Sequence, residues 1–167
     1  MVRPIVFSGV VYWMVGFQPL KGKFFIFTGF MVLCQLCATS LGLMTSALCR
    51  TTDLSLTVLP TVLELNRLFG GFLLSPKNLP KHFVWLDALS YVKYTYIGVS
   101  LNELEGLQIT CLPTELVNGV CQAPSGQQTI SDLGLGYLKP RDCALIIILF
   151  ILVTQVVVYL GIRFLKH

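Results

Sequence analysis

The chain has 167 residues, of which 54% are hydrophobic and 12% are charged, and its formal net charge is +4 at pH 7. Soluble domains carry about 25% charged residues, so this composition excludes an ordinary soluble domain and indicates an integral membrane protein. The positive charge is small and forms no dense basic run, which argues against a nucleic-acid partner. The length allows about four or five spanning helices and no additional soluble catalytic domain.

Two uncharged stretches open the chain. Residues 4–20 are just long enough to cross ~30 Å of hydrocarbon, and residues 24–49 are long enough to cross it with tilt. The second stretch is rich in small and hydroxyl-bearing residues, which allow close approach of helices in lipid. A basic residue before the first stretch is also typical of a signal peptide, but no small-residue cleavage site follows. Both stretches therefore predict spanning helices.

A third span is predicted over residues 54–75, and it carries two charges, Glu64 and Arg67. Because they are three residues apart, they share one helix face. That face repeats at steps of three or four residues through Thr57, Pro60, Glu64, Arg67 and Gly71. Either the charges form an internal salt bridge against a neighbouring helix, or they belong to a polar strip that lines a cavity. Gly70 and Gly71 weaken the helix near its far end.

Residues 80–105 combine an apolar sequence with three recurring charges, Asp87, Lys93 and Glu103, and with several tyrosines and a tryptophan. A short, charged, aromatic-rich helix is typical of a re-entrant or interfacial segment. We therefore predict re-entrant helices here, with an ordinary fourth span as the alternative.

Residues 106–142 form a polar loop that contains Cys111 and Cys121, and an extracellular position of this loop would favour a disulfide between them. Residues 143–162 are a further uncharged span, followed by a basic tail of cytosolic type. An external loop would place the two lysines of the 21–23 turn outside as well, against the positive-inside tendency. We give the cysteine argument precedence.

No catalytic or metal site is predicted. The cysteine pair at 34 and 37 lies in an apolar stretch without a second ligand pair, whereas a zinc site needs four ligands. His82 and His167 are isolated at segment ends, and no Ser/His/Asp, Cys/His or two-carboxylate set can meet. The fold expected is an all-α membrane protein with four transmembrane helices, a re-entrant helical segment and a disulfide-containing external loop.

Three motifs resemble those of a known family. They are F-G-G-F-L-L at residues 69–74, W-L-D-A-L-S-Y-V-K-Y at 85–94 and N-E at 102–103. In this order, before a cysteine-containing loop and a last span, they resemble the membrane domain of ABC transporters of the G subfamily. These are the white/brown-complex half-transporters of ABC-2 type. The resemblance covers essentially the whole chain, as the C-terminal part of that domain, and matches the third to sixth spans.

The resemblance implies a homo- or heterodimer in the plasma membrane that exports lipophilic or amphipathic compounds by alternating access. ATP hydrolysis in a nucleotide-binding domain, in cis or in trans, would drive export. The implied sites are a substrate cavity (Thr57, Pro60, Glu64, Arg67), an apolar plug (Phe72, Leu73), a hinge (Gly70, Gly71) and an external disulfide (Cys111, Cys121). Such cavities are usually apolar, so Glu64 and Arg67 depart from the family pattern.

The sequence contains no G-x-x-x-x-G-K-[ST] phosphate loop. ATP and Mg²⁺ are therefore expected in a separate nucleotide-binding domain, with no cofactor in this chain, which is either a fragment or a permease half. Two other functions remain open. One is a four-span membrane organiser or a transporter fragment without activity of its own. The other is a proton-coupled carrier that uses Glu64 and Arg67, although no inverted repeat supports it.

Overall fold

The computed structural model describes residues 2–18, 21–49, 51–70, 84–107 and 125–165. Within these ranges every regular element is an α-helix, which confirms the expected all-α class. In chain order the helices are α1 (Val2–Val15), α2 (Lys21–Leu48), α3 (Thr52–Leu68), α4 (Val84–Leu89), α5 (Tyr91–Leu104), α6 (Gly126–Leu133) and α7 (Pro140–Leu165).

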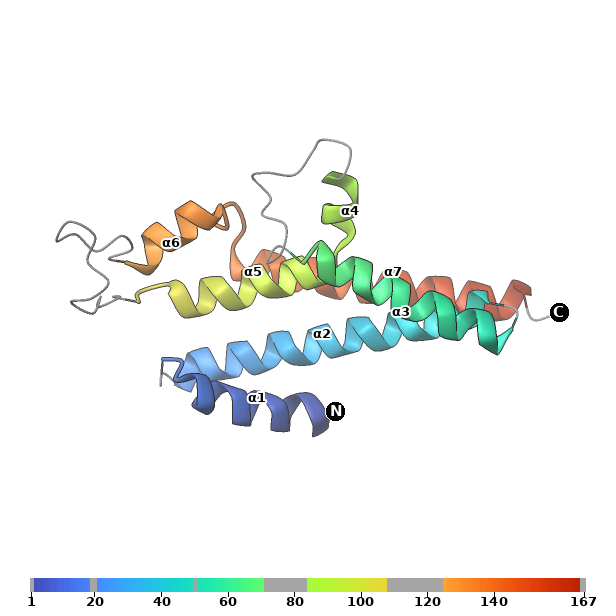
Figure 1. The fold of residues 1–167 in the computed structure, drawn as a ribbon, viewed down its shortest axis with the longest axis horizontal. Helices are drawn as coiled ribbons and strands as arrows, with labels where there is room; N and C mark the ends of the chain where they lie inside the picture. The colour runs from blue at the N-terminus through green and yellow to red at the C-terminus, as the bar shows by residue number, and fades with distance from the viewer. Residues whose placement is uncertain (1, 19–20, 50, 71–83, 108–124, 166–167) are drawn as a thin grey trace.

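The bundle is built on the two longest helices, α2 and α7, which pack against each other along the long axis (Figure 1). Helix α1 lies against the first part of α2. Helix α3 packs on α2 in the half of the bundle near the C-terminus, while α5 packs on both α2 and α7 in the other half. Helix α6 contacts α5. This arrangement brings the chain segments 54–68 and 91–104 end to end.

Two of the described helices are long and apolar enough to cross a membrane, Gly22–Leu48 and Pro140–Phe164. Only 28% and 22% of their most apolar windows are buried, so neither is the enclosed core helix of a soluble domain. Large apolar side chains such as Phe25 and Leu149 point outward instead, as lipid-facing side chains do. The other two predicted spans correspond to the shorter helices α1 and α3, and their crossing of the membrane stays a prediction.

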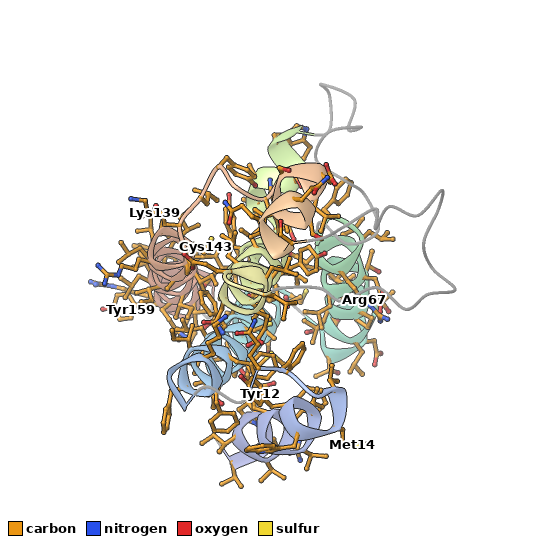
Figure 2. All side chains as sticks on the ribbon, turned by 90° about the vertical axis from the view of Figure 1, so that its left-hand side faces the viewer. Tyr12, Met14, Arg67, Lys139, Cys143 and Tyr159 are labelled. Atoms are coloured by element: carbon orange, nitrogen blue, oxygen red, sulfur yellow. The ribbon has the colours of Figure 1, made fainter. Side chains whose placement is uncertain are left out.

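Helix α5 lies at the centre of the bundle. The end-on view shows it between α2, α3, α6 and α7 (Figure 2). Its buried Ile97 and Leu101 join a core that also contains Phe30 of α2 and Ile147 of α7. A Cβ at Gly98 would overlap the ring of Phe30, so glycine permits the close approach of α2 and α5.

Polar contacts join α2 and α7 inside the bundle. The Gln155 amide donates to Ser40 Oγ at 3.0 Å, and the thiol of Cys37 lies 3.8 Å from the carbonyl oxygen of Ile147. At the other end of the interface, a Cβ at Gly161 would be 3.4 Å from the Cβ of Ala47. Small side chains and inter-helix hydrogen bonds of this kind are typical of helix packing in lipid.

Several boundaries differ from the predicted ones. Helix α1 ends at Val15 because Gly16 adopts a left-handed conformation with φ of 73°. The predicted loop 106–142 is wrong in part, since it contains α6, which Ser125 caps and Gly134 terminates at φ 68°. Helix α7 begins at Pro140, a residue favoured in the first helical turn because its missing N–H is not needed there.

Candidate functional site

The first candidate site is the outward face of α3. The side chains of Thr57, Pro60, Glu64 and Arg67 are all exposed, and no residue of α3 is buried. The end-on view places Arg67 on the side of α3 that points away from α2 and α5 (Figure 2). All four predicted cavity residues therefore share one unpacked face. Within the described chain, no neighbouring helix covers that face.

Glu64 and Arg67 pair with each other across this face. Arg67 Nη1 lies 3.4 Å from Glu64 Oε1, while 73% of the Arg67 side chain and 65% of the Glu64 side chain are exposed. Arg67 also lies in the last turn of α3, where a positive charge is favourable beside the negative end of the helix dipole. The predicted salt bridge exists, but it does not face any of the other described helices.

Local sequence determines where α3 begins and how it continues. The Thr51 side chain accepts a hydrogen bond from the Leu54 N–H at 3.4 Å and so caps the helix, and Asp53 adds negative charge to its first turn. The helix continues through Pro60, which lacks an N–H and leaves one backbone carbonyl without its usual partner. That break in the hydrogen-bond ladder lies one turn before Glu64.

The end of α3 is joined directly to the start of α5. Ser90 Oγ donates to the Asn66 carbonyl at 2.8 Å and accepts from the Lys93 N–H at 3.4 Å, which caps α5. Gly70 is buried beside them, and a Cβ there would be 2.9 Å from Val92 Cγ1. Gly70 therefore permits a close approach between the two helices. Its predicted hinge role stays a prediction.

A second pair of opposite charges lies inside the bundle, and sequence reasoning did not pair its members. Lys93 Nζ donates to Asp87 Oδ2, and both residues are buried. Lys93 Nζ also lies 5.7 Å from the ring centroid of Tyr137, within cation–π range. The other oxygen, Asp87 Oδ1, is buried without a hydrogen-bond partner in the described part of the chain. The sequence did contain a sign of this pair, namely two opposite charges six residues apart in an apolar stretch. Six residues is not a spacing that brings side chains together on one helix, and the contact forms because the helix is interrupted at Ser90.

A third polar group joins α5 to the turn between α1 and α2. The Gln18 N–H donates to a Glu103 carboxylate oxygen at 3.4 Å, and the Asn102 amide donates to the other at 3.1 Å. The Asn102 amide also donates to the Lys23 carbonyl at 3.1 Å, and Lys23 Nζ donates to the Glu105 carbonyl at 2.7 Å. Asn102 and Glu103 are buried, so this motif has a packing role in the structure.

Five predicted site residues lie outside the described residues: Gly71, Phe72, Leu73, Cys111 and Cys121. The four described cysteines, at positions 34, 37, 49 and 143, are free thiols. The described ranges also contain no group of three His, Cys, Asp or Glu residues placed to hold a metal ion. Among the predicted sites, the face of α3 is therefore the one that can be built from described side chains.

Comparison with known proteins identifies the relatives of the chain. A family model described as "ABC-2 type transporter" matches residues 1–104. ABC transporter G family member 3 of Dictyostelium discoideum is 27% identical over 188 aligned residues, which cover 99% of this chain and 13% of that protein. Protein white of Ceratitis capitata is 32% identical over 79% of this chain and 19% of that protein. Protein white of Drosophila melanogaster is 30% identical over 96% of this chain. The chain thus spans less than a quarter of these relatives' length.

Proposed function

Since the chain belongs to the ABC-2 type transporter family and is the membrane domain of a G-family ABC transporter, we propose that it forms the translocation path of an ATP-driven exporter. The path would lie in the plasma membrane and alternate between inward and outward access, and the compounds exported would be lipophilic or amphipathic. The observation that carries the proposal is the face of α3, where a charged pair in a predicted membrane helix remains exposed.

A charged pair within a membrane helix needs a protein or water environment. Ionisable groups in lipid are costly and nearly always face a bundle interior or a water-filled cavity. Helices α2 and α5 occupy the opposite side of α3, so the described part of this chain does not provide that interior. A second half-transporter would provide it by placing its own α3 across a two-fold axis. The cavity between the two helices would then be lined by Thr57, Pro60, Glu64 and Arg67.

The remaining parts of the proposal follow the family resemblance. Gly70 and Gly71 would act as the hinge that leads to a plug formed by Phe72 and Leu73. Cys111 and Cys121 would form a disulfide in the external loop. ATP and Mg²⁺ would be held by nucleotide-binding domains in cis or in trans, because this chain has no phosphate-loop motif.

The proposal is tested by transport in proteoliposomes that contain this chain with its nucleotide-binding domains. Efflux of a lipophilic dye should require hydrolysable ATP and should stop with vanadate. A cysteine introduced at Thr57 should form a crosslink between two copies of the chain, because the proposed axis brings their α3 faces together. Transport driven by a proton gradient without ATP would contradict the proposal, as would crosslinked dimers that never move a compound.

A further inference from the structure

Three polar side chains on α3 already have a partner within the helix. Thr57 Oγ1 donates to the Asp53 carbonyl and Thr61 Oγ1 to the Thr57 carbonyl, each at 3.1 Å. The Asn66 amide donates to the Val62 carbonyl at 2.9 Å. Such bonds to residue i−4 use the one donor of each threonine hydroxyl and one of the two N–H donors of the Asn66 amide. None of these three side chains carries a charge to offer a compound in the cavity.

The Glu64–Arg67 pair is different because most of its hydrogen-bonding capacity is unused. A guanidinium carries five N–H donors, and a carboxylate accepts at about four positions. Glu64 and Arg67 contact each other at 3.4 Å, and neither forms an ion pair with a third described residue. An exposed pair at this spacing adds little to helix stability. Both groups are thus available to a ligand.

Apolar side chains flank the pair on the face of α3. Pro60 and Leu68, four residues before and after Glu64, are exposed beside it on the same face. At 1.5 Å per residue, Glu64 and Arg67 lie ~18 Å and ~22 Å along α3 from its start. The pair therefore lies near the C-terminal end of α3, with Arg67 in its last turn, and has apolar surface next to it. A molecule seated here would meet adjacent opposite charges and hydrocarbon together.

Building on the exporter function proposed above, we propose that Glu64 and Arg67 recognise the transported compound, and that this compound is a small amphipathic zwitterion. Its anionic group would accept hydrogen bonds from the Arg67 guanidinium, for which bidentate geometry is favoured. Its cationic group would donate to the Glu64 carboxylate. Its apolar body would contact the neighbouring surface of Pro60 and Leu68.

Desolvation explains why a zwitterion is preferred over compounds with one charge or none. A simple anion would pair with Arg67 and leave the Glu64 carboxylate desolvated without a partner, and a simple cation would do the reverse. A neutral hydrocarbon would remove water from both charges and return no hydrogen bond. A zwitterion satisfies both groups at once.

The test uses four compounds with one phenylpropyl body: phenylalanine (zwitterion), 3-phenylpropionate (anion), 3-phenylpropylamine (cation) and 3-phenylpropanol (neutral). ATP-dependent transport and stimulation of ATP hydrolysis are measured in proteoliposomes that contain the chain with its nucleotide-binding domains. Phenylalanine should reach half-maximal transport and half-maximal stimulation of ATP hydrolysis at a concentration about tenfold or more below that of 3-phenylpropanol. Glu64→Gln and Arg67→Gln should each raise the phenylalanine concentration needed by about tenfold or more, as expected when one member of a desolvated charge pair is lost.

Thr61→Val is the matched control, because Thr61 lies one turn away and its hydroxyl already donates to the helix. It should leave the response to phenylalanine within about twofold. The zwitterion assignment would be overturned if 3-phenylpropanol were transported as well as or better than phenylalanine, and if Glu64→Gln and Arg67→Gln left that transport unchanged. The exporter function would remain supported by that result. Absence of any ATP-dependent transport would instead overturn the exporter function, and the assignment with it.

A further outcome would assign the pair to the subunit interface. Mass measurement of the purified particles would then show that Glu64→Gln and Arg67→Gln reduce the dimer fraction. The exchanged variant Glu64→Arg/Arg67→Glu would restore it. The zwitterion proposal expects the dimer fraction of both single variants to equal that of the unchanged protein.

Discussion

The described residues contain two pairs of opposite charges in adjacent helical segments, and these two pairs differ sharply in their surroundings. On α3, the Glu64–Arg67 pair is largely exposed and its atoms are 3.4 Å apart. Between α4 and α5, Asp87 and Lys93 are buried together, with the Tyr137 ring beside the lysine. The same chemistry is therefore enclosed in the bundle at one place and exposed on the surface of the described chain at the other.

The comparison shows that burial and partners, rather than the presence of charge, separate structural from functional groups here. A buried ion pair cannot lose one member without leaving the other desolvated. An exposed pair can exchange its contact for a ligand at little cost, because the contact itself contributes about 0–1 kcal/mol. Substitutions in the two regions should therefore differ strongly in their effect on stability.

Asp87→Asn should have the largest effect. It leaves the Lys93 ammonium buried without its anion, and the free energy of unfolding should fall by about 3–5 kcal/mol. Unfolding in mixed micelles, followed by circular dichroism, measures this change. The double variant Asp87→Leu/Lys93→Leu should recover part of the loss, since it removes both buried charges. A loss below about 1 kcal/mol for Asp87→Asn would show that the pair does not stabilise the bundle.

Glu103→Ala should have the next largest effect. The Glu103 carboxylate accepts hydrogen bonds from the Gln18 N–H and from the Asn102 amide inside the bundle. Loss of a charged acceptor should reduce the free energy of unfolding by about 1.5–3 kcal/mol. Glu105→Ala is the matched control, because the exposed Glu105 contacts Lys23 through its backbone carbonyl rather than its side chain. Equal losses in both variants would rule out the hydrogen-bonded role of Glu103.

Gly70→Ala tests the contact that joins the two regions. The new Cβ would lie 2.9 Å from both Val92 Cγ1 and the Arg67 carbonyl oxygen, so it should reduce the free energy of unfolding by about 1–3 kcal/mol. Adding Val92→Ala should recover part of that loss. Gly29→Ala is the control, because a Cβ there meets no atom within 4 Å, and this helix position should gain about 0.5–1 kcal/mol. If Gly70→Ala left the free energy of unfolding unchanged, the end of α3 and the start of α5 would not be held in close contact.

Composition and hydrophobic patterning were sufficient for the parts of the fold that depend on local sequence. They predicted the all-α class, the two long apolar helices and the shared face of Glu64 and Arg67. Helix α6 was missed because its eight residues include only two large apolar side chains, Ile130 and Leu133, within a Gly- and Pro-containing stretch, and two such residues are too few to show a helical period. Its Ser125 cap and its terminal Gly134 were the available signals.

The long-range parts of the site could not be predicted in the same way. The pairing of Asp87 with Lys93 depends on the angle between α4 and α5, and the bond from Ser90 to the Asn66 carbonyl joins segments 24 residues apart in sequence. Periodicity describes one helix at a time and does not report such contacts. The central position of α5 was hidden for the same reason, because its charges are typical of an exposed helix until their buried partners are known.

Glu64→Gln should have the smallest effect on stability. It removes one member of an exposed pair whose partner can be solvated, so the free energy of unfolding should change by less than about 1 kcal/mol. ATP-driven transport of phenylalanine should nevertheless weaken, because the carboxylate is proposed to contact the compound. Measuring both quantities on one preparation separates stability from function. A stability loss as large as that of Asp87→Asn would mean that the face of α3 is packed in the assembled protein, and a cavity at that face would then be excluded.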